Sequence, residues 1–245
     1  YDGELKRPNQ GPHMSGKLMQ KIKEWERKNR ARYSHDIVDP EERKKSLHYN
    51  DWVDHGILRY RWHNFAEIAP GIYRSNHPNH ERFEAYHDLG VKTVLNLRGK
   101  THHAHYYFEV ESCEKLGMTL IDIPMSARKV PTVDVLMQVM DTLEKLDTPT
   151  LMHCKSGADR TGLVSAIYLL HILGKPVEEA REMLSIRFVH LNFTKTGILD
   201  YVIDHYARRV SQSPIAFKDW VVTEYDPAKA DAEFKAMGFW QRLKL

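Results

Sequence analysis

LMHCKSGADRTGL, at residues 151–163, is the stretch that decides the fold. Its apolar start predicts a buried strand that ends at His153, and the apolar residues after Thr161 recur at helical spacing. A tight loop from strand to helix therefore lies between them. Backbone N–H groups at the start of a helix lack intrahelical partners, and the helix dipole adds positive charge there. We expect this loop to bind an anion of the size of phosphate.

Two reactive side chains stand at the ends of the loop, Cys154 at its start and Arg160 at its close. A thiol in such a field ionises near neutral pH, and a guanidinium holds two phosphate oxygens in a planar fork. The pair predicts a thiolate nucleophile beside a bound phosphate. A nucleotide-binding P-loop is excluded, because Leu163 and Val164 stand where that motif needs Lys and Ser or Thr.

The whole motif, with His153 before the cysteine, Gly157 inside the loop and Thr161-Gly162 after the arginine, resembles the signature loop of the cysteine-dependent protein tyrosine phosphatase superfamily. The sequences GIYRS (71–75) and NLR (96–98) resemble bacterial dual-specificity-like phosphatase domains, and residues 192–200 resemble a segment that follows the loop in proteobacterial members. The resemblance covers roughly residues 66–210. It implies hydrolysis of phosphate monoesters without a metal or cofactor, in which Cys154 attacks phosphorus and water then releases phosphate.

The resemblance also assigns roles within the loop. Thr161 is expected to donate a hydrogen bond to the sulfur or to cap the first turn of the helix, and His153 to orient the loop. The arginine and the loop amides are expected to stabilise charge on the phosphate oxygens. The predicted phosphate-binding residues are Lys155, Ser156, Gly157, Ala158, Asp159 and Arg160.

The proton donor for the leaving oxygen is where the sequence departs from the family pattern. Dual-specificity and lipid phosphatases usually carry an Asp in the loop after the strand that here ends in Pro124, but residues 125–130 contain no carboxylate. Asp159 is the preferred candidate, because some bacterial tyrosine phosphatases and the myotubularin-type lipid phosphatases have Asp directly before the loop arginine. Asp122 is the alternative, and geometry decides between them.

Further cations are expected near the loop. Arg98 ends a predicted strand at 91–99, and open parallel sheets bind ligands beyond such strand ends, so Arg98 either faces the crevice or forms a structural ion pair. Lys155 resembles one of the two loop lysines of phosphoinositide phosphatases, and Arg128 is a candidate to supply the missing charge. Alternatively, Lys155 points to solvent.

Strands and helices alternate along the chain, which predicts an α/β fold with a central, mostly parallel sheet and helices on both faces. This is the fold that the resemblance implies, that of protein tyrosine and dual-specificity phosphatases. Helices are expected at 81–89, 105–116, 132–146, 161–173, 176–186, 195–210 and 228–243. We expect residues 1–13 to be a remnant of tag cleavage and cloning, 14–54 a charged helical N-terminal extension, 55–212 the phosphatase catalytic domain, and 213–245 a C-terminal helical extension.

Composition narrows the class of protein. The 245 residues carry a net charge of +3, a mild basic bias that suits anionic substrates and falls short of a nucleic-acid-binding signature. Two cysteines indicate neither a disulfide framework nor a zinc site. A catalytic thiolate and the lack of a long apolar run predict a cytoplasmic protein. A basic amphipathic helix at 15–32 either packs on the catalytic domain or contacts an anionic membrane.

Together these features predict a bacterial phosphatase that acts on phosphotyrosine-type or dual-specificity protein substrates. The alternative within enzymes is a lipid phosphatase for phosphoinositides, phosphatidylglycerol phosphate or lipid A-type phosphates at a membrane surface. A catalytically inactive phosphate-binding module is the rival from another class, and the intact pair of Cys154 and Arg160 argues against it.

Overall fold

The computed structural model describes residues 20, 24 and 37–245, and these residues form a five-stranded sheet of order β1-β2-β5-β3-β4. Strand β1 is antiparallel to β2, and the other neighbours are parallel. The mostly parallel α/β fold expected from the sequence is confirmed. The strands are β1 (Ala66–Ala69), β2 (Ile72–Asn76), β3 (Thr93–Asn96), β4 (Thr119–Asp122) and β5 (Thr150–Cys154).

Strand β5 lies at the centre of the sheet and carries the cysteine at its carboxyl end. His153 is in register with Ser75 on β2 and with Asn96 on β3. All five residues of β5 are buried, because helices cover both faces of the sheet, and this explains the continuous apolar run in the sequence. Two flanking strands therefore fix the position of Cys154.

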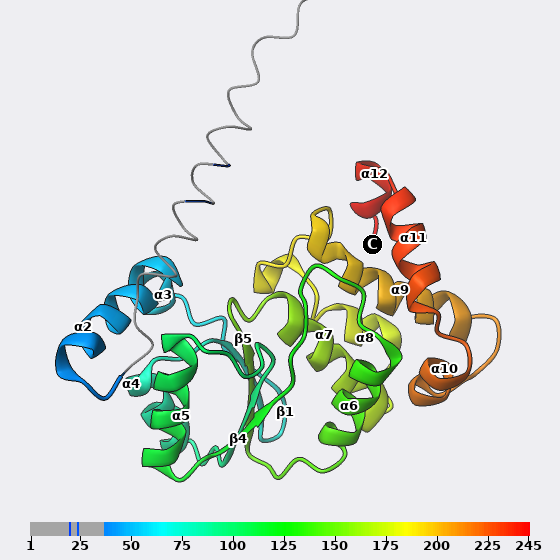
Figure 1. Ribbon diagram of the computed structural model, residues 1–245. Coiled ribbons are helices and arrows are strands. Elements are labelled where there is room, and N and C mark those ends of the chain that lie inside the picture. The colour runs from blue at the N-terminus through cyan, green and yellow to red at the C-terminus, as the bar shows by residue number, and fades with distance from the viewer. Residues whose placement is uncertain (1–19, 21–23, 25–36) are drawn as a thin grey trace, which may run out of the picture.

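Helices form a layer on each face of the sheet (Figure 1). One face packs on α4 (His80–Asp88) and α5 (Ala104–Leu116), with Leu151 in its core. The other face, with Met152 in its core, is covered by four helices. Leu151 and Met152 pack against opposite helical layers because successive side chains of a strand point to opposite faces of the sheet. The four helices are α6 (Val133–Leu143), α7 (Asp159–Ile167) with its π-helical continuation η2 (Tyr168–Ile172), α8 (Val177–Arg181) and α9 (Ile198–Val210).

The first described helices lie beside α5. Asp39 caps α2 (Pro40–His48) by accepting hydrogen bonds from the backbone N–H groups of Glu41 and Glu42, and Pro40 suits the first position of the helix. The Arg43 guanidinium contacts Glu111 of α5 at 2.8 Å. The π-helical turn η1 (Tyr49–Val53) and α3 (Gly56–Arg59) then lead into β1.

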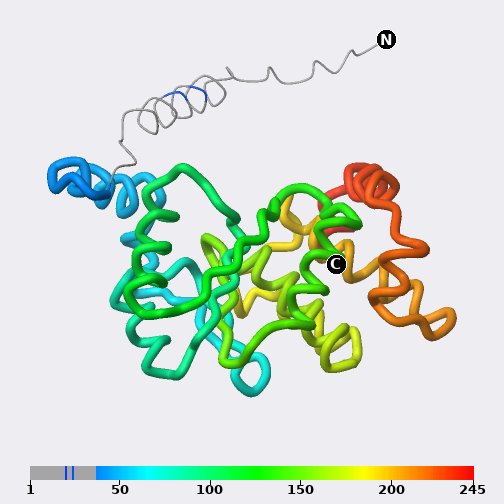
Figure 2. Tube along the Cα trace, turned by 60° about the horizontal axis from the view of Figure 1, so that its bottom comes forward, coloured from blue at the N-terminus to red at the C-terminus, as the bar shows by residue number. Residues whose placement is uncertain are grey.

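The last helices lie at the opposite end of the molecule, as the turned view also shows (Figure 2). They are α10 (Phe217–Thr223), α11 (Pro227–Ala236) and α12 (Phe239–Arg242). Phe217, Trp220 and Phe234 are buried in the same apolar cluster as Met152. The proposed division at 54/55 and 212/213 stays a prediction, and residues 1–13 and the basic helix at 15–32 lie outside the described residues, apart from positions 20 and 24.

The structure differs from the expected elements in several places. The helix expected at 228–243 is two helices, because Met237 has an extended backbone conformation. The helix expected at 176–186 ends at Arg181, and the short 3₁₀ turns η3 (Ile186–Phe188) and η4 (Lys195–Gly197) precede α9. Strand β1 and helix α10 were not expected.

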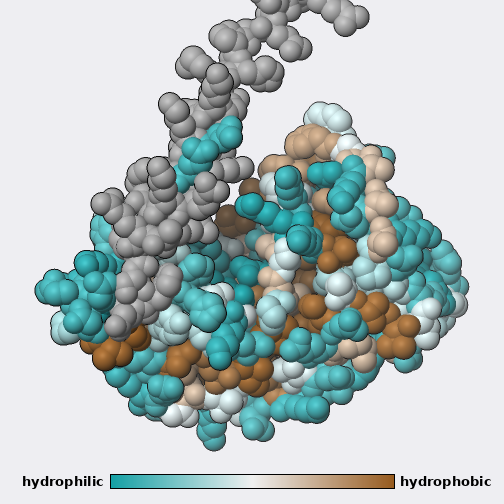
Figure 3. Space-filling model, viewed as in Figure 1, coloured by the Kyte–Doolittle hydropathy of each residue, from teal (hydrophilic) through white to brown (hydrophobic). Residues whose placement is uncertain are grey.

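Hydrophilic side chains cover much of the face seen in Figure 1, and a hydrophobic band crosses its lower part (Figure 3). Within the described residues, no helix combines the length and the apolar character that crossing a membrane requires.

Candidate functional site

The loop between β5 and α7 is held from outside by its carbonyl groups. The carbonyl of Lys155 accepts a hydrogen bond from the backbone N–H of His77 at 3.3 Å. The carbonyl of Ser156 accepts from the Asn64 side chain at 3.0 Å, and that of Gly157 accepts from Arg74 at 2.6 Å. In a trans peptide the N–H points opposite to the C=O. The N–H groups of Ser156 and Gly157 therefore face into the loop, as an anion site requires, whereas the N–H of Ala158 donates to the Ser156 hydroxyl at 3.3 Å.

Gly157 allows the loop to approach β2. Its φ is +71°, and a Cβ there would lie 2.6 Å from the backbone carbonyl of Ser75. Any larger residue would meet both a strained backbone and a clash. The guanidinium of Arg74, fully buried on β2, also binds the Met183 carbonyl at 2.9 Å and lies 3.6 Å from the centre of the Phe188 ring. This arginine joins the loop to the segment that follows α8.

Cys154 is buried at the base of the loop, and its surroundings favour the thiolate. Burial alone raises the pKa of the thiol, but the charge of Arg160 and hydrogen bonds from Thr161 outweigh burial, so the pKa is lowered overall. The Thr161 hydroxyl has no other hydrogen-bond partner among the described residues. Cys113 differs, because burial raises its pKa to about 12. The two thiols therefore have opposite character.

Arg160 is fixed by the ends of two strands. Its Nη1 lies 3.3 Å from the carbonyl oxygen of Leu97, just after β3, and 3.3 Å from that of Met125, just after β4. These contacts hold the guanidinium beside the loop. The arrangement suits binding of phosphate oxygens next to the thiolate.

His153 is tied to a carboxylate on the α5 side of the sheet. Its Nε2 lies 2.6 Å from Glu109 Oε1, and both side chains are fully buried. His77 Nδ1 lies 3.8 Å from the other carboxylate oxygen. These three residues are close enough to share a metal ion, but among the described residues they supply three ligands where a closed zinc site has four. The pair suits the orienting role predicted for His153.

The two candidate acids occupy different surroundings. Asp122 Oδ1 accepts from the Asn96 side chain at 2.8 Å, and Oδ2 accepts from the Tyr106 hydroxyl at 2.7 Å. Both oxygens are thus engaged by neighbours at the edge of the sheet. Asp159 begins α7 directly before Arg160, and its Oδ1 lies 2.7 Å from His190 Nδ1. The geometry favours Asp159 as the proton donor, which stays a prediction.

The predicted cations separate into two places. Arg98 forms an ion pair with Asp54, the alternative role considered for it, and Lys155 Nζ lies 3.3 Å from the same carboxylate rather than pointing freely to solvent. Arg128 is exposed and borders a depression shared with α11. Asp54 also contacts Arg59 at 3.0 Å, so its carboxylate organises the cations next to the loop.

Sequence reasoning missed several residues around the site. Asp54 fell within the presumed N-terminal extension, and Asn64 lies in no motif. Arg74 belongs to the GIYRS motif at 71–75, but the motif does not show that its guanidinium binds the backbone of the loop. His190 stands alone in the sequence, although its partner Asp200 ends the segment 192–200 that resembled other family members. The segment 192–200 and the GIYRS motif were the available signals.

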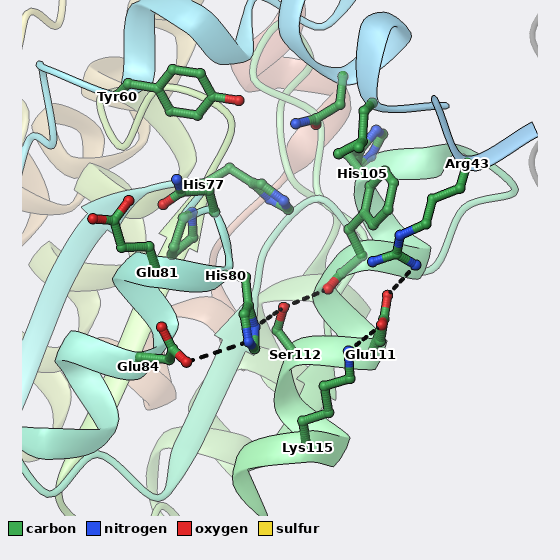
Figure 4. Close-up of a pocket in the computed structure, with 15 residues that line it drawn as sticks. Arg43, Tyr60, His77, His80, Glu81, Glu84, His105, Glu111, Ser112 and Lys115 are labelled. Atoms are coloured by element: carbon green, nitrogen blue, oxygen red, sulfur yellow. Dashed lines mark hydrogen bonds and ion pairs between the residues drawn. The ribbon is translucent and has the colours of Figure 1, made fainter. Parts of the chain in front are cut away.

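A separate pocket of about 390 Å³ lies between α2, α4 and α5 (Figure 4). Buried His77 and His105 reach it, while ion pairs and hydrogen bonds line its opposite side. Arg43 and Lys115 both bind Glu111, and His80 lies between Glu84 and Ser112. None of residues 154–160, which form the phosphate-binding loop, lines this pocket, so it is distinct from the site around Cys154.

Comparison with known proteins gives the following matches. Residues 69–173 match a family model described as a polymorphic toxin system, DSP-PTPase phosphatase. The dual specificity protein phosphatase TpbA of Pseudomonas aeruginosa (strain UCBPP-PA14) is 29% identical over 124 residues, which are 49% of this chain and 52% of that protein. The inositol diphosphatase SIW14 of Saccharomyces cerevisiae is 32% identical over 106 residues, 40% of this chain and 36% of that protein.

Among solved structures, the crystal structure of P. aeruginosa TpbA matches with a TM-score of 0.46 and 22% identity, covering 71% of this chain and 91% of that chain. The curated relatives are matched over about half of their length or less.

Proposed function

We propose that the protein is a cysteine-based dual-specificity-like phosphatase, the family whose model residues 69–173 match, and that it hydrolyses phosphate monoesters through a cysteinyl-phosphate intermediate on Cys154. The observation that carries the proposal is the position of Cys154, buried at the base of the loop beside Arg160 and Thr161, which lower its pKa. Nucleophilic attack on phosphorus requires a thiolate next to a loop that holds the phosphate.

The reaction proceeds in two steps. The Cys154 thiolate attacks phosphorus, the S–P bond forms, and the P–O bond breaks while Asp159 gives its proton to the leaving oxygen. A water molecule then attacks phosphorus and gives a proton to Asp159, the S–P bond breaks, and inorganic phosphate leaves. Throughout, Arg160 and the loop amides stabilise the phosphoryl oxygens.

Phosphotyrosine-type or dual-specificity protein substrates are the first candidate class, supported by the similarity to TpbA. A phosphorylated inositol is the second, because relatives include inositol diphosphatases and because Arg59, Arg98 and Lys155 surround the single carboxylate of Asp54 beside the loop. This excess of positive charge suits a substrate with more than one phosphate.

Phosphate release tests the proposal. A phosphotyrosine peptide, an inositol pyrophosphate and vesicles containing a phosphoinositide would be compared for the wild type, Cys154→Ser and the control Cys113→Ser. We expect turnover by the wild type and Cys113→Ser, and a loss of at least about 10³-fold in Cys154→Ser. Acid quenching with a ³²P-labelled substrate should trap labelled phosphate on the wild type and none on Cys154→Ser. Turnover retained by Cys154→Ser would refute the thiolate mechanism, and the ranking of substrates assigns the class.

A further inference from the structure

His190 lies between two carboxylates from different helices. Its Nδ1 is 2.7 Å from Asp159 Oδ1 at the start of α7, and its Nε2 is 2.5 Å from Asp200 Oδ2 on α9. The imidazole side chain is fully buried, and Asp200 is nearly so. With a carboxylate on each ring nitrogen, the ring donates two hydrogen bonds only when it is protonated.

The charges around the ring favour that protonated form. Burial alone lowers the pKa of His190, but the hydrogen bonds and charges of Asp159 and Asp200 raise it to about 9. Those two carboxylates, from α7 and α9, are the charged groups that act on the ring. Asp159 in turn raises the pKa of Cys154, so a cation bound to Asp159 also offsets a charge that opposes the thiolate.

We propose that His190, held by Asp200, is a positioning residue that orients Asp159 toward the phosphate loop and stabilises the carboxylate formed when Asp159 gives up its proton. The inference rests on the proposed function and adds a part to it. In the first step the Asp159 proton goes to the leaving oxygen, and the His190 N–H then donates to the new carboxylate. In the second step the proton from water restores the Asp159 carboxyl, so His190 neither gains nor loses a proton overall.

Location of the pair supports this assignment. Asp159 is adjacent to Arg160, whose guanidinium is fixed beside the loop, whereas the Asp122 oxygens are engaged by Asn96 and Tyr106. The segment that leads to His190 is joined to the loop by two buried side chains. Arg74 binds the Gly157 and Met183 carbonyls, and Asn64 donates to the Ser156 carbonyl at 3.0 Å and to the Phe188 carbonyl at 2.9 Å, two residues before His190.

The test compares two aryl phosphates, phenyl phosphate and dinitrophenyl phosphate. The phenolate of the first needs a proton as it leaves, and that of the second does not. We expect His190→Gln to lower kcat/KM for phenyl phosphate by roughly 10–100-fold and for dinitrophenyl phosphate by less than about 3-fold.

Asp200→Asn provides a second variant with an isosteric side chain, and its effects should have the same direction and smaller size. Asp204→Asn is the matched control, since Asp204 lies one turn further along α9 and pairs with Arg181 and Arg208 away from the loop. In an Asp159→Asn background, His190→Gln should cause no further loss on phenyl phosphate. Thermal unfolding of each variant confirms that it is folded.

Equal losses on both substrates, or additive losses in the double variant, would overturn the role of His190. Those outcomes leave the proposed function standing as long as Cys154→Ser is inactive. Activity retained by Cys154→Ser would instead overturn the proposed function itself.

Discussion

Asp54 and Arg98 form a two-pronged ion pair, with Oδ1 2.8 Å from Nη2 and Oδ2 2.9 Å from Nη1. The same carboxylate reaches Arg59 and Lys155. Burial alone raises the pKa of Asp54, but the charges of Arg98 and Lys155 outweigh it and hold the pKa well below its usual range. The chain before the first strand is thus fastened to the end of β3 and to the phosphate loop.

Replacing Asp54 is expected to destabilise the fold. Asp54→Asn leaves the buried cations Arg59 and Arg98 without their counter-charge, which lowers the free energy of unfolding by about 3–5 kcal/mol. Urea unfolding measures the change. The control is Glu41→Gln, which removes an exposed ion pair with Lys44 and should change stability by less than about 1 kcal/mol. Comparable changes in the two variants would contradict the structural role of Asp54.

Gly157→Ala is expected to disrupt the phosphate loop. The new Cβ would stand 2.6 Å from the Ser75 backbone, at a φ that L-residues rarely adopt. We expect the free energy of unfolding to fall by more than about 2 kcal/mol and vanadate binding to become undetectable. Calorimetry measures both changes.

Gly117→Ala is the matched control for backbone strain. Its φ is +64°, yet a Cβ there meets nothing within 4 Å. The expected loss is about 1 kcal/mol, with vanadate binding unchanged. If Gly157→Ala binds vanadate as well as Gly117→Ala does, the close approach of the loop to β2 is not required.

Stability should fall as the pH rises from about 6.5 to 9. The folded protein holds a proton on His190 more tightly than the unfolded chain, so this stabilisation is complete below pH 6.5 and is lost as the pH passes the folded pKa of about 9. The expected loss is on the order of 1–3 kcal/mol. Below pH 6.5 stability falls for the opposite reason, because burial lowers the pKa values of His77 and His105.

Thermal unfolding across this pH range measures the effect. In His190→Gln the fall between pH 6.5 and 9 should be smaller, while the loss on the acidic side stays. An unchanged alkaline slope in that variant would assign the proton to another group.

The thiolate of Cys154 should be detectable by its ultraviolet absorbance. Arg160 and Thr161 lower the pKa of Cys154, so the titration midpoint lies below the ordinary thiol value. Thr161→Val should raise the midpoint by roughly 0.5–1 unit. Cys113→Ser should leave the signal unchanged near neutral pH, because burial keeps that thiol protonated. A neutral-pH signal that disappears in Cys113→Ser would reverse the assignment.

The parts of the fold that the sequence predicted are those with strong local periodicity or a specific loop motif. The buried run before Cys154 became β5, and Thr132 caps α6 as its position indicated. Helix α8 and the break at Met237 were mispredicted, because weak helical periodicity there yields to turns that tertiary contacts stabilise. Strand β1 escaped prediction because it is a short edge strand with three of its four residues partly or fully exposed.

The loop itself was predictable, since its spacing is a local property of the chain. Its supports were not. Asp54 follows η1, Arg74 lies on β2 and His190 precedes α9. Their roles depend on distances between elements that are remote in sequence. A lone buried charge becomes interpretable only when its partner is known.

The buried guanidinium of Arg74 connects the phosphate-binding loop to the segment that follows α8. It binds Gly157 on one side and the segment leading to His190 on the other. Displacing either of these two segments would leave the buried guanidinium without a hydrogen-bond partner, at a cost of several kcal/mol. The loop and the segment that leads to His190 therefore share a buried anchor before any ligand binds. Exposed segments around the mouth are free to diversify toward new substrates while the alignment of the reacting groups persists.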